Sequence, residues 1–116
     1  MKLRQMLLGA LLALIGGVAA GGGYLPAPLT VDFENQTASG DMYSARLSDN
    51  PHALIGCGYR SPAPGFTFGF CQARVGPADD QLAQCFTEDP AHIAAIAALD
   101  DFSYIVFRWD DDGNCV

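Results

Sequence analysis

Residues 52–87 read HALIGCGYRSPAPGFTFGFCQARVGPADDQLAQCFT, and their pattern determines most of the predicted sheet. They hold three runs rich in β-favouring residues, separated by two turns rich in Pro, Gly or Asp. This alternation predicts three antiparallel strands joined by two hairpins. The runs are 52–60, 66–75 and 81–87, and the turns between them are 61–65 and 76–80.

The expected register of these hairpins places three cysteines in one row. Centring the first hairpin on residue 64 puts Cys57 opposite Cys71, and centring the second on residue 78 puts Cys85 opposite Cys71. Adjacent strands lie about 4.8 Å apart and bridged Cα atoms about 5.5 Å apart, so a bridge from Cys57 to Cys85 would have to skip a strand. Two pairings remain open: Cys57–Cys71 with Cys85–Cys115, which we favour slightly, and Cys71–Cys85 with Cys57–Cys115.

The same register gives the three strands two different faces. The face with the cysteines carries mostly small residues, whereas the opposite face carries Phe66, Phe68, Phe70 and Phe86. Such phenylalanines more often belong to a core, but they would mark a partner surface if they were exposed. Opposite the glycines Gly58 and Gly69, the register places the aromatic residues Phe70 and Tyr59, which can cover the bare backbone of a strand glycine.

A helix is expected after the third strand, because Asp89 can cap it and Pro90 suits its first position. Its body, Ala91 to Leu99, is rich in alanine and can approach a sheet closely only where the sheet residues are small. We therefore expect this helix to lie over the row of cysteines.

Two further segments are predicted to be strands. Met42 to Leu47 follows a Ser-Gly-Asp turn, and Phe102 to Trp109 is apolar on both faces, which is typical of a central strand. Together these elements predict an α+β fold: one small antiparallel sheet of four to five strands, an Ala-rich helix packed on one face, and two disulfides.

The amino-terminal residues have the layout of a secretory signal peptide. Lys2 and Arg4 precede an uncharged apolar run that ends in small residues at 17–20. We expect residues 1–20 to be a signal peptide, residues 21–37 an amino-terminal arm or linker, and residues 38–116 the disulfide-stabilised domain. Paired cysteines fit this export, since disulfides persist in secreted or periplasmic proteins.

Charge limits the partners of the mature chain. Without residues 1–20 the chain keeps four arginines, no lysine and all 13 acidic residues, so its net charge is −9 with neutral histidines. Phosphate backbones and anionic lipid repel such a chain, which argues against nucleic acid and, after signal removal, against membranes as partners. The charge favours solubility and would attract a basic partner.

The sequence offers only weak candidates for chemistry, and it predicts no cofactor. The cysteines are 14, 14 and 30 residues apart, too far for the usual zinc pairs. The calcium pattern is incomplete, since it lacks a ligand at Arg108 and a distal Glu, and a hairpin turn explains the same residues. Acid–base candidates lack a nucleophile at a recognisable spacing. The calcium candidates are Asp110, Asp112 and Asn114; the acid–base candidates are His52, His92 and the pairs Asp79–Asp80 and Asp100–Asp101.

The cysteine frame and its surroundings resemble a group of small exported bacterial proteins that is known only as uncharacterised. The resemblance covers about residues 38–116 and implies a compact, disulfide-bonded α+β domain without a known activity, so it assigns no catalytic residue. The matching residues are Gly56-Cys57, Cys71, Cys85 to Pro90, Ser103-Tyr104-Ile105, Phe107, Trp109-Asp110, Gly113 and Cys115.

A second resemblance concerns a short element. Ser39-Gly40-Asp41-Met42-Tyr43 is similar to the S-G-x-x-Y element of periplasmic inhibitors of C-type lysozyme, which plug the cleft of a basic enzyme. This resemblance implies that Ser39, Gly40 and Tyr43 form an inhibitor loop. Taken together, the sequence favours an exported, non-catalytic binding or envelope-associated domain; the alternatives are an inhibitor of a basic hydrolase such as lysozyme, and a small secreted hydrolase.

Overall fold

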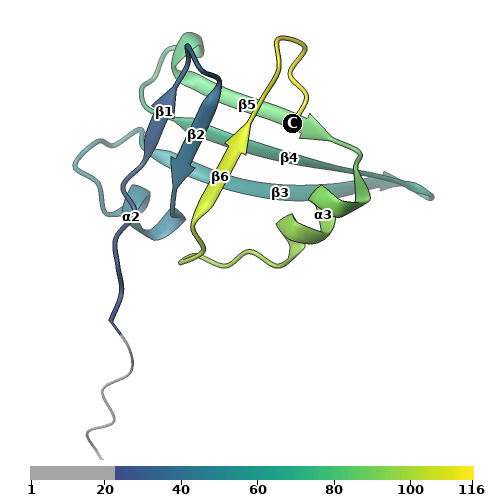
Figure 1. Cartoon of the computed structure of the whole chain (residues 1–116), viewed down its shortest axis with the longest axis horizontal. Coiled ribbons are helices and arrows are strands. Elements are labelled where there is room, and N and C mark those ends of the chain that lie inside the picture. Colours follow the sequence, from purple (N-terminus) through teal and green to yellow (C-terminus); the bar gives the residue numbers. More distant parts are fainter. Residues whose placement is uncertain (1–22) are drawn as a thin grey trace, which may run out of the picture.

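The structure is a computed structural model that describes residues 23–116, so the expected signal peptide lies outside the described residues. The described chain is α+β, with two antiparallel sheets of three strands each and α3 as its longest helix (Figure 1). The strands are β1 Thr30–Asp32, β2 Thr37–Gly40, β3 Leu54–Ala63, β4 Phe66–Arg74, β5 Leu82–Thr87 and β6 Ile105–Arg108; the helices are α2 Met42–Arg46, the 3-10 helix η1 Asp79–Gln81, and α3 Pro90–Ala97.

The sheet β3-β4-β5 has the register that the hairpins predict. Cys57 pairs with Cys71, and Cys71 pairs with Cys85. The ring of Phe70 covers Gly58, with its Cζ atom 2.8 Å from the position that a Cβ atom would take there. Gly69 is covered differently, because the side chains nearest its Cβ position include Ile96 of α3 rather than the Tyr59 opposite.

Both disulfides follow the first of the two pairings. Cys57 is bonded to Cys71 across β3 and β4, and Cys85 is bonded to Cys115 near the end of the chain. The second bond closes 30 residues of sequence against 14 for the first, so it joins β5 to a segment that follows β6.

The prediction of one sheet is wrong, because β1, β2 and β6 form a sheet of their own. In Figure 1 this sheet crosses in front of β3-β4-β5 at a steep angle. The prediction that residues 102–109 form a central strand is also wrong, since β6 is an edge strand in the order β1-β2-β6. Its residues alternate between buried and exposed, and the apolar Val106 is 52% exposed. Strand β1 and the first residue of β2 fall within the segment 21–37 and pair within this sheet.

The carboxyl-terminal residues connect the two sheets. The amide of Cys115 donates to the carbonyl of Phe86 in β5 at 2.9 Å, and the amide of Val116 donates to the carbonyl of Arg108 in β6 at 3.1 Å. Residues 114–116 (the tail) thus run parallel to β5 and antiparallel to the end of β6. The Cys85–Cys115 disulfide fixes the tail in this position.

Helix α2 replaces the strand predicted for Met42 to Leu47. Asp41 is its N-cap and accepts a hydrogen bond from the amide of Ser44 at 2.6 Å. A carboxylate that satisfies the amide three residues later stabilises a helix start, and this outweighs the β propensity of the segment. Helix α3, in contrast, begins as predicted, with Asp89 as N-cap and Pro90 in its first turn.

The core lies between the two sheets, on the cysteine face of β3-β4-β5. Helix α3 covers only one end of this face, where Ile96 packs against the core, while β2 and β6 contribute Ala38, Ile105 and Phe107 to its centre. The preference for a phenylalanine core is wrong, since Phe66 and Phe86 on the opposite face are 42% and 46% exposed. The buried core residues are Ala38, Ala45, Ile55, Cys71, Ala73, Ala83, Cys85, Ile105 and Phe107.

Candidate functional site, a groove between helix α3 and strand β6

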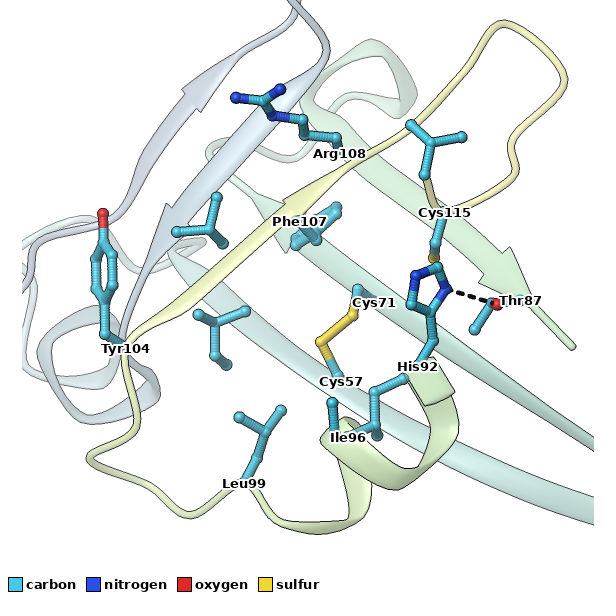
Figure 2. Close-up of a pocket in the computed structure, with 14 residues that line it drawn as sticks. Cys57, Cys71, Thr87, His92, Ile96, Leu99, Tyr104, Phe107, Arg108 and Cys115 are labelled. Atoms are coloured by element: carbon cyan, nitrogen blue, oxygen red, sulfur yellow. Dashed lines mark hydrogen bonds between the residues drawn. A yellow bond between two sulfur atoms is a disulfide. The ribbon is translucent and has the colours of Figure 1, made fainter. Parts of the chain in front are cut away.

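An open apolar groove of about 220 Å³ lies where α3, β6 and the tail meet (Figure 2). Its volume is below the roughly 300–1,000 Å³ of sites that enclose drug-sized ligands. The groove can therefore accept one or two apolar side chains rather than a whole small molecule. Its walls come from α3 (His92, Ala95, Ile96), Leu99, β6 with Tyr104, the tail residues Cys115 and Val116, Thr87, and the Cys57–Cys71 disulfide.

The groove is built by three local features of the sequence. The Ala-rich helix brings Ile96 beside the Cys57–Cys71 disulfide, as Figure 2 shows. Strand β6 turns Phe107 toward the interior, where it is 6% exposed. The disulfide to Cys115 holds the tail at the far end of the groove. None of the lining residues is acidic.

One polar pair borders the groove. The hydroxyl of Thr87 lies 3.0 Å from Nδ1 of His92 and also accepts a hydrogen bond from the amide of Asp89 at 3.1 Å. A hydroxyl beside an imidazole is the start of a nucleophile–base pair, but such a base is normally oriented by a third group on its other nitrogen. Within residues 23–116 no side chain bonds Nε2 of His92. The pair instead anchors the first turn of α3 to the end of β5.

The other acid–base candidates do not join this pair. His52 lies two residues before β3. His92 lies beside Thr87, which pairs across the sheet with Gly69, and Gly69 pairs in turn with Tyr59 of β3, so His92 is level with Tyr59. Seven residues separate His52 from Tyr59 along the chain, which is roughly 20 Å in an extended strand. The acidic pairs serve turns: Asp79–Asp80 lies in η1, and Asp100 accepts a hydrogen bond from the amide of Phe102 at 2.9 Å.

The calcium candidates form a turn after β6. The carboxylate of Asp110 accepts hydrogen bonds from the amides of Asp112 and Asn114, at 3.0 and 2.8 Å, and from the side chain of Asn114. These bonds, first of all the one from the Asn114 amide, lower the pKa of Asp110. Gly113 takes a positive φ of 82° in this turn. Residues 23–116 contain no cluster of three or more His, Cys, Asp or Glu placed to hold a metal.

The S-G-x-x-Y element is divided between a strand and a helix. Ser39 and Gly40 end β2 and pair with Val106 and Ile105 of β6, and Gly40 is buried with a φ of 147°. Tyr43 is 36% exposed on α2 and packs against Phe102, with ring centroids 5.0 Å apart. The three residues therefore do not form one exposed loop.

A buried carboxylate in this element ties the amino-terminal segment to the domain. Asp41, 1% exposed, accepts hydrogen bonds from the hydroxyl of Tyr24, the amide of Ala27, and the amide and hydroxyl of Ser44. Burial by itself raises the pKa of Asp41, but these hydrogen bonds outweigh burial and lower it to about 2. Sequence reasoning missed this group; the Asp-x-x-Ser spacing of a helix cap was the available signal.

Sequence reasoning also missed the groove itself. Its signal lies in 102–109, where apolar residues occur on both faces of a strand. We interpreted that pattern as central burial. It instead marks a strand with one exposed apolar face, because Tyr104 and Val106 are 63% and 52% exposed.

Comparison with known proteins finds no matching family model, no similar curated protein and no similar solved structure. In the part of the chain that the structure describes, no helix is both long and apolar enough to cross a membrane. Any functional assignment therefore rests on the geometry of this chain.

Proposed function

We propose that this protein is an exported, non-catalytic binding domain, secreted or periplasmic, whose groove between α3 and β6 takes a segment of a basic partner protein. The observation that supports it is the groove: it is apolar, open, too small for a typical small-molecule ligand, and lined by no acidic residue. A catalytic site would need an acid–base group that a neighbouring side chain orients. His92 borders the groove, and among the described residues no side chain bonds its Nε2 atom to orient it.

Arg108 is a basic residue that lines the groove, but acidic residues outnumber it in the segments around the groove and support a basic partner. Asp100 and Asp101 precede β6, Asp110 to Asp112 follow it, and Glu88 and Asp89 precede α3. Opposite charges on a partner would speed association and suppress acidic competitors, although they add little affinity at an exposed rim. The export and the oxidised cysteines support each other, since four bonded cysteines are expected outside the cytoplasm.

A selection experiment tests this function. Linear dodecapeptides from a phage-displayed library are selected on the oxidised protein and titrated by calorimetry. We expect enriched peptides with apolar and basic residues, and at least tenfold weaker binding after Ala95→Trp, which fills the groove from an exposed position on α3. Ala94→Trp is the matched control, because Ala94 is exposed on the same helix but does not line the groove. Failure to enrich peptides, or equal binding by both variants, would refute the proposal.

A further inference from the structure

We propose that the partner segment binds as an added β-strand, antiparallel to β6 and in line with the tail. This inference rests on the proposed function and names its binding mode: main-chain hydrogen bonds to the free edge of β6, with alternate apolar side chains entering the groove. Strand addition to an exposed sheet edge is an established way in which proteins recognise extended peptides.

The hydrogen bonds of β6 show which of its residues face outward. The amide of Trp109 donates to the carbonyl of Gln36, beside the paired strand β2. In a strand, alternate residues direct their backbone groups to the same side, so Phe107 and Ile105 also face β2. The carbonyl of Arg108 accepts from Val116 on the other side. Val106 therefore directs its amide and carbonyl away from β2, toward the groove side.

This outer edge is only partly used in the described structure. Among residues 23–116, β6 pairs with β2, and the tail bonds to its end at Arg108 and Asp110. Neither the amide nor the carbonyl of Val106 has a backbone partner there. Exposed edges of this kind can pair with another chain unless they are short, charged or covered.

The tail sets the direction and register of an added strand. Trp109 pairs antiparallel with Cys115, so Val116 already lies opposite Arg108. Hydrogen-bonded positions recur every two residues in an antiparallel pair, and the next one along β6 is Val106. A segment that continues this line runs past Tyr104, along residues that line the groove. Figure 2 shows Cys115 at one end of this path and Tyr104 at the other.

The pleat of the added strand determines which of its side chains enter the groove. Side chains opposite Phe107 and Ile105 point inward, because both of these residues are buried. They meet the disulfide and the α3 residues Ile96 and Ala95 in the groove. Side chains opposite Val106 point outward, on the face where β6 carries the exposed Arg108. Basic residues are therefore expected at the ends of the segment, beside Asp100–Asp101 and Asp110–Asp112. The expected ligand is an apolar-x-apolar segment with Lys or Arg at flanking positions.

Charge argues against a second copy of this chain as the occupant. Each copy carries four arginines and 13 acidic residues in residues 23–116. Antiparallel pairing of two β6 strands centred on Val106 brings Asp100–Asp101 of one copy beside Asp110–Asp112 of the other. Like charges opposite each other destabilise strand pairs, so a basic segment of another protein is favoured.

An N-methyl scan of the tightest peptide from the selection tests the mode. Methylation removes one amide donor at a time. If the peptide is an added strand, the amide of every second residue faces β6, and methylation of these amides weakens binding at least tenfold. Methylation of the residues between them changes binding less than twofold. A scan without alternation, combined with loss of binding in Ala95→Trp, overturns strand addition and leaves groove binding intact. If the Ala95→Trp variant binds the peptide as tightly as the wild type, the proposed function of the groove is overturned.

A protein variant provides the matching test. Val106→Pro removes the free amide of β6 without removing a bond to β2, and Val106→Thr keeps the amide. We expect at least tenfold weaker binding for the proline variant and less than threefold for the threonine variant. Equal binding by both folded variants overturns the proposal. Sedimentation equilibrium tests whether a second copy of this chain is the occupant. A wild-type dimer that becomes monomeric in Val106→Pro would identify a second copy and overturn the proposal of a different partner protein.

Discussion

At the level of single residues, Asp41 is the buried charged residue among residues 23–116. Its carboxylate is 1% exposed and faces only donors, from Tyr24, Ala27 and Ser44. Asp41→Asn replaces one acceptor oxygen by an NH₂ group that meets another donor. We expect the free energy of unfolding to fall by about 2–3 kcal/mol, the cost of an unsatisfied buried group, as measured by urea denaturation.

The control for this substitution is the same chemical change at an exposed site. Asp49→Asn alters an exposed residue for which the structure shows no side-chain hydrogen bond, so it should change stability by less than about 0.5 kcal/mol. Tyr24→Phe removes one donor to Asp41 and should lower the free energy of unfolding by less than Asp41→Asn does, because the other donors remain. Equal stability of Asp41→Asn and Asp49→Asn would show that the buried network contributes nothing.

The lowered pKa of Asp41 also predicts a dependence of stability on pH. Burial raises this pKa and the hydrogen bonds lower it more, to about 2 from an ordinary 3.8. Because the folded pKa is the lower one, the charged carboxylate stabilises the fold above about pH 4, and this contribution disappears as the pH falls toward 2. The wild type should lose on the order of 1–2 kcal/mol more than Asp41→Asn between pH 5 and pH 2. If the wild type and Asp41→Asn lost the same free energy of unfolding between pH 5 and pH 2, the hydrogen-bond network would not account for the pH dependence.

At the scale of elements, the packing of α3 on β4 depends on a glycine. A Cβ atom at Gly69 would lie 2.9 Å from Cδ1 of Ile96 and 3.1 Å from Cγ2 of Thr87. Gly69→Ala should therefore push α3 outward and cost about 1–3 kcal/mol, the usual cost of overpacking. Ile96→Val removes the nearest atom, so the double variant should recover part of this loss in a double-mutant cycle. Additive losses would mean that α3 is not held against Gly69.

The elements show which parts of a fold a sequence of this kind reveals. The hairpins of β3, β4 and β5 were predictable in register, because Pro- and Gly-rich turns and an alternating pattern determine strand pairing locally. The start of α3 was predictable from Asp89 and Pro90 for the same reason. Helix α2 was not, because its start depends on the single Asp41–Ser44 bond, and five residues give too little periodicity to reveal a helix.

At the scale of the whole molecule, the arrangement of the two sheets is what sequence reasoning lacked. A short turn at residues 33–36 joins β1 to β2, but β6 is short and far from β2 in sequence, so no turn chemistry specifies that β2 and β6 pair. The apolar residues on both faces of 102–109 were interpreted as central burial, but only Ile105 and Phe107 on one face are buried, whereas Tyr104 and Val106 on the other face are exposed. The candidate site was therefore not predictable, since it is formed by α3, β6 and the tail only after they assemble.

The two disulfides predict different losses for the whole domain. Loop-closure entropy gives about 3.0 kcal/mol for the 14-residue loop of Cys57–Cys71 and about 3.6 kcal/mol for the 30-residue loop of Cys85–Cys115. Each double Ala variant removes one buried and one partly buried cysteine, so the two variants are matched in lost packing. Cys85→Ala with Cys115→Ala also frees the tail that joins β5 to β6, and we expect it to lower the Tm further than its counterpart does.

Hydrogen exchange separates this effect of the tail from simple entropy. In Cys85→Ala with Cys115→Ala, the amides of Phe86, Cys115 and Val116 should exchange at least tenfold faster, because their bonds to and from residues 113–116 open locally. In Cys57→Ala with Cys71→Ala the same amides should stay protected, since the tail remains bonded to β5. Unchanged protection of these amides after loss of the Cys85–Cys115 bond would show that hydrogen bonds alone hold the tail between the sheets.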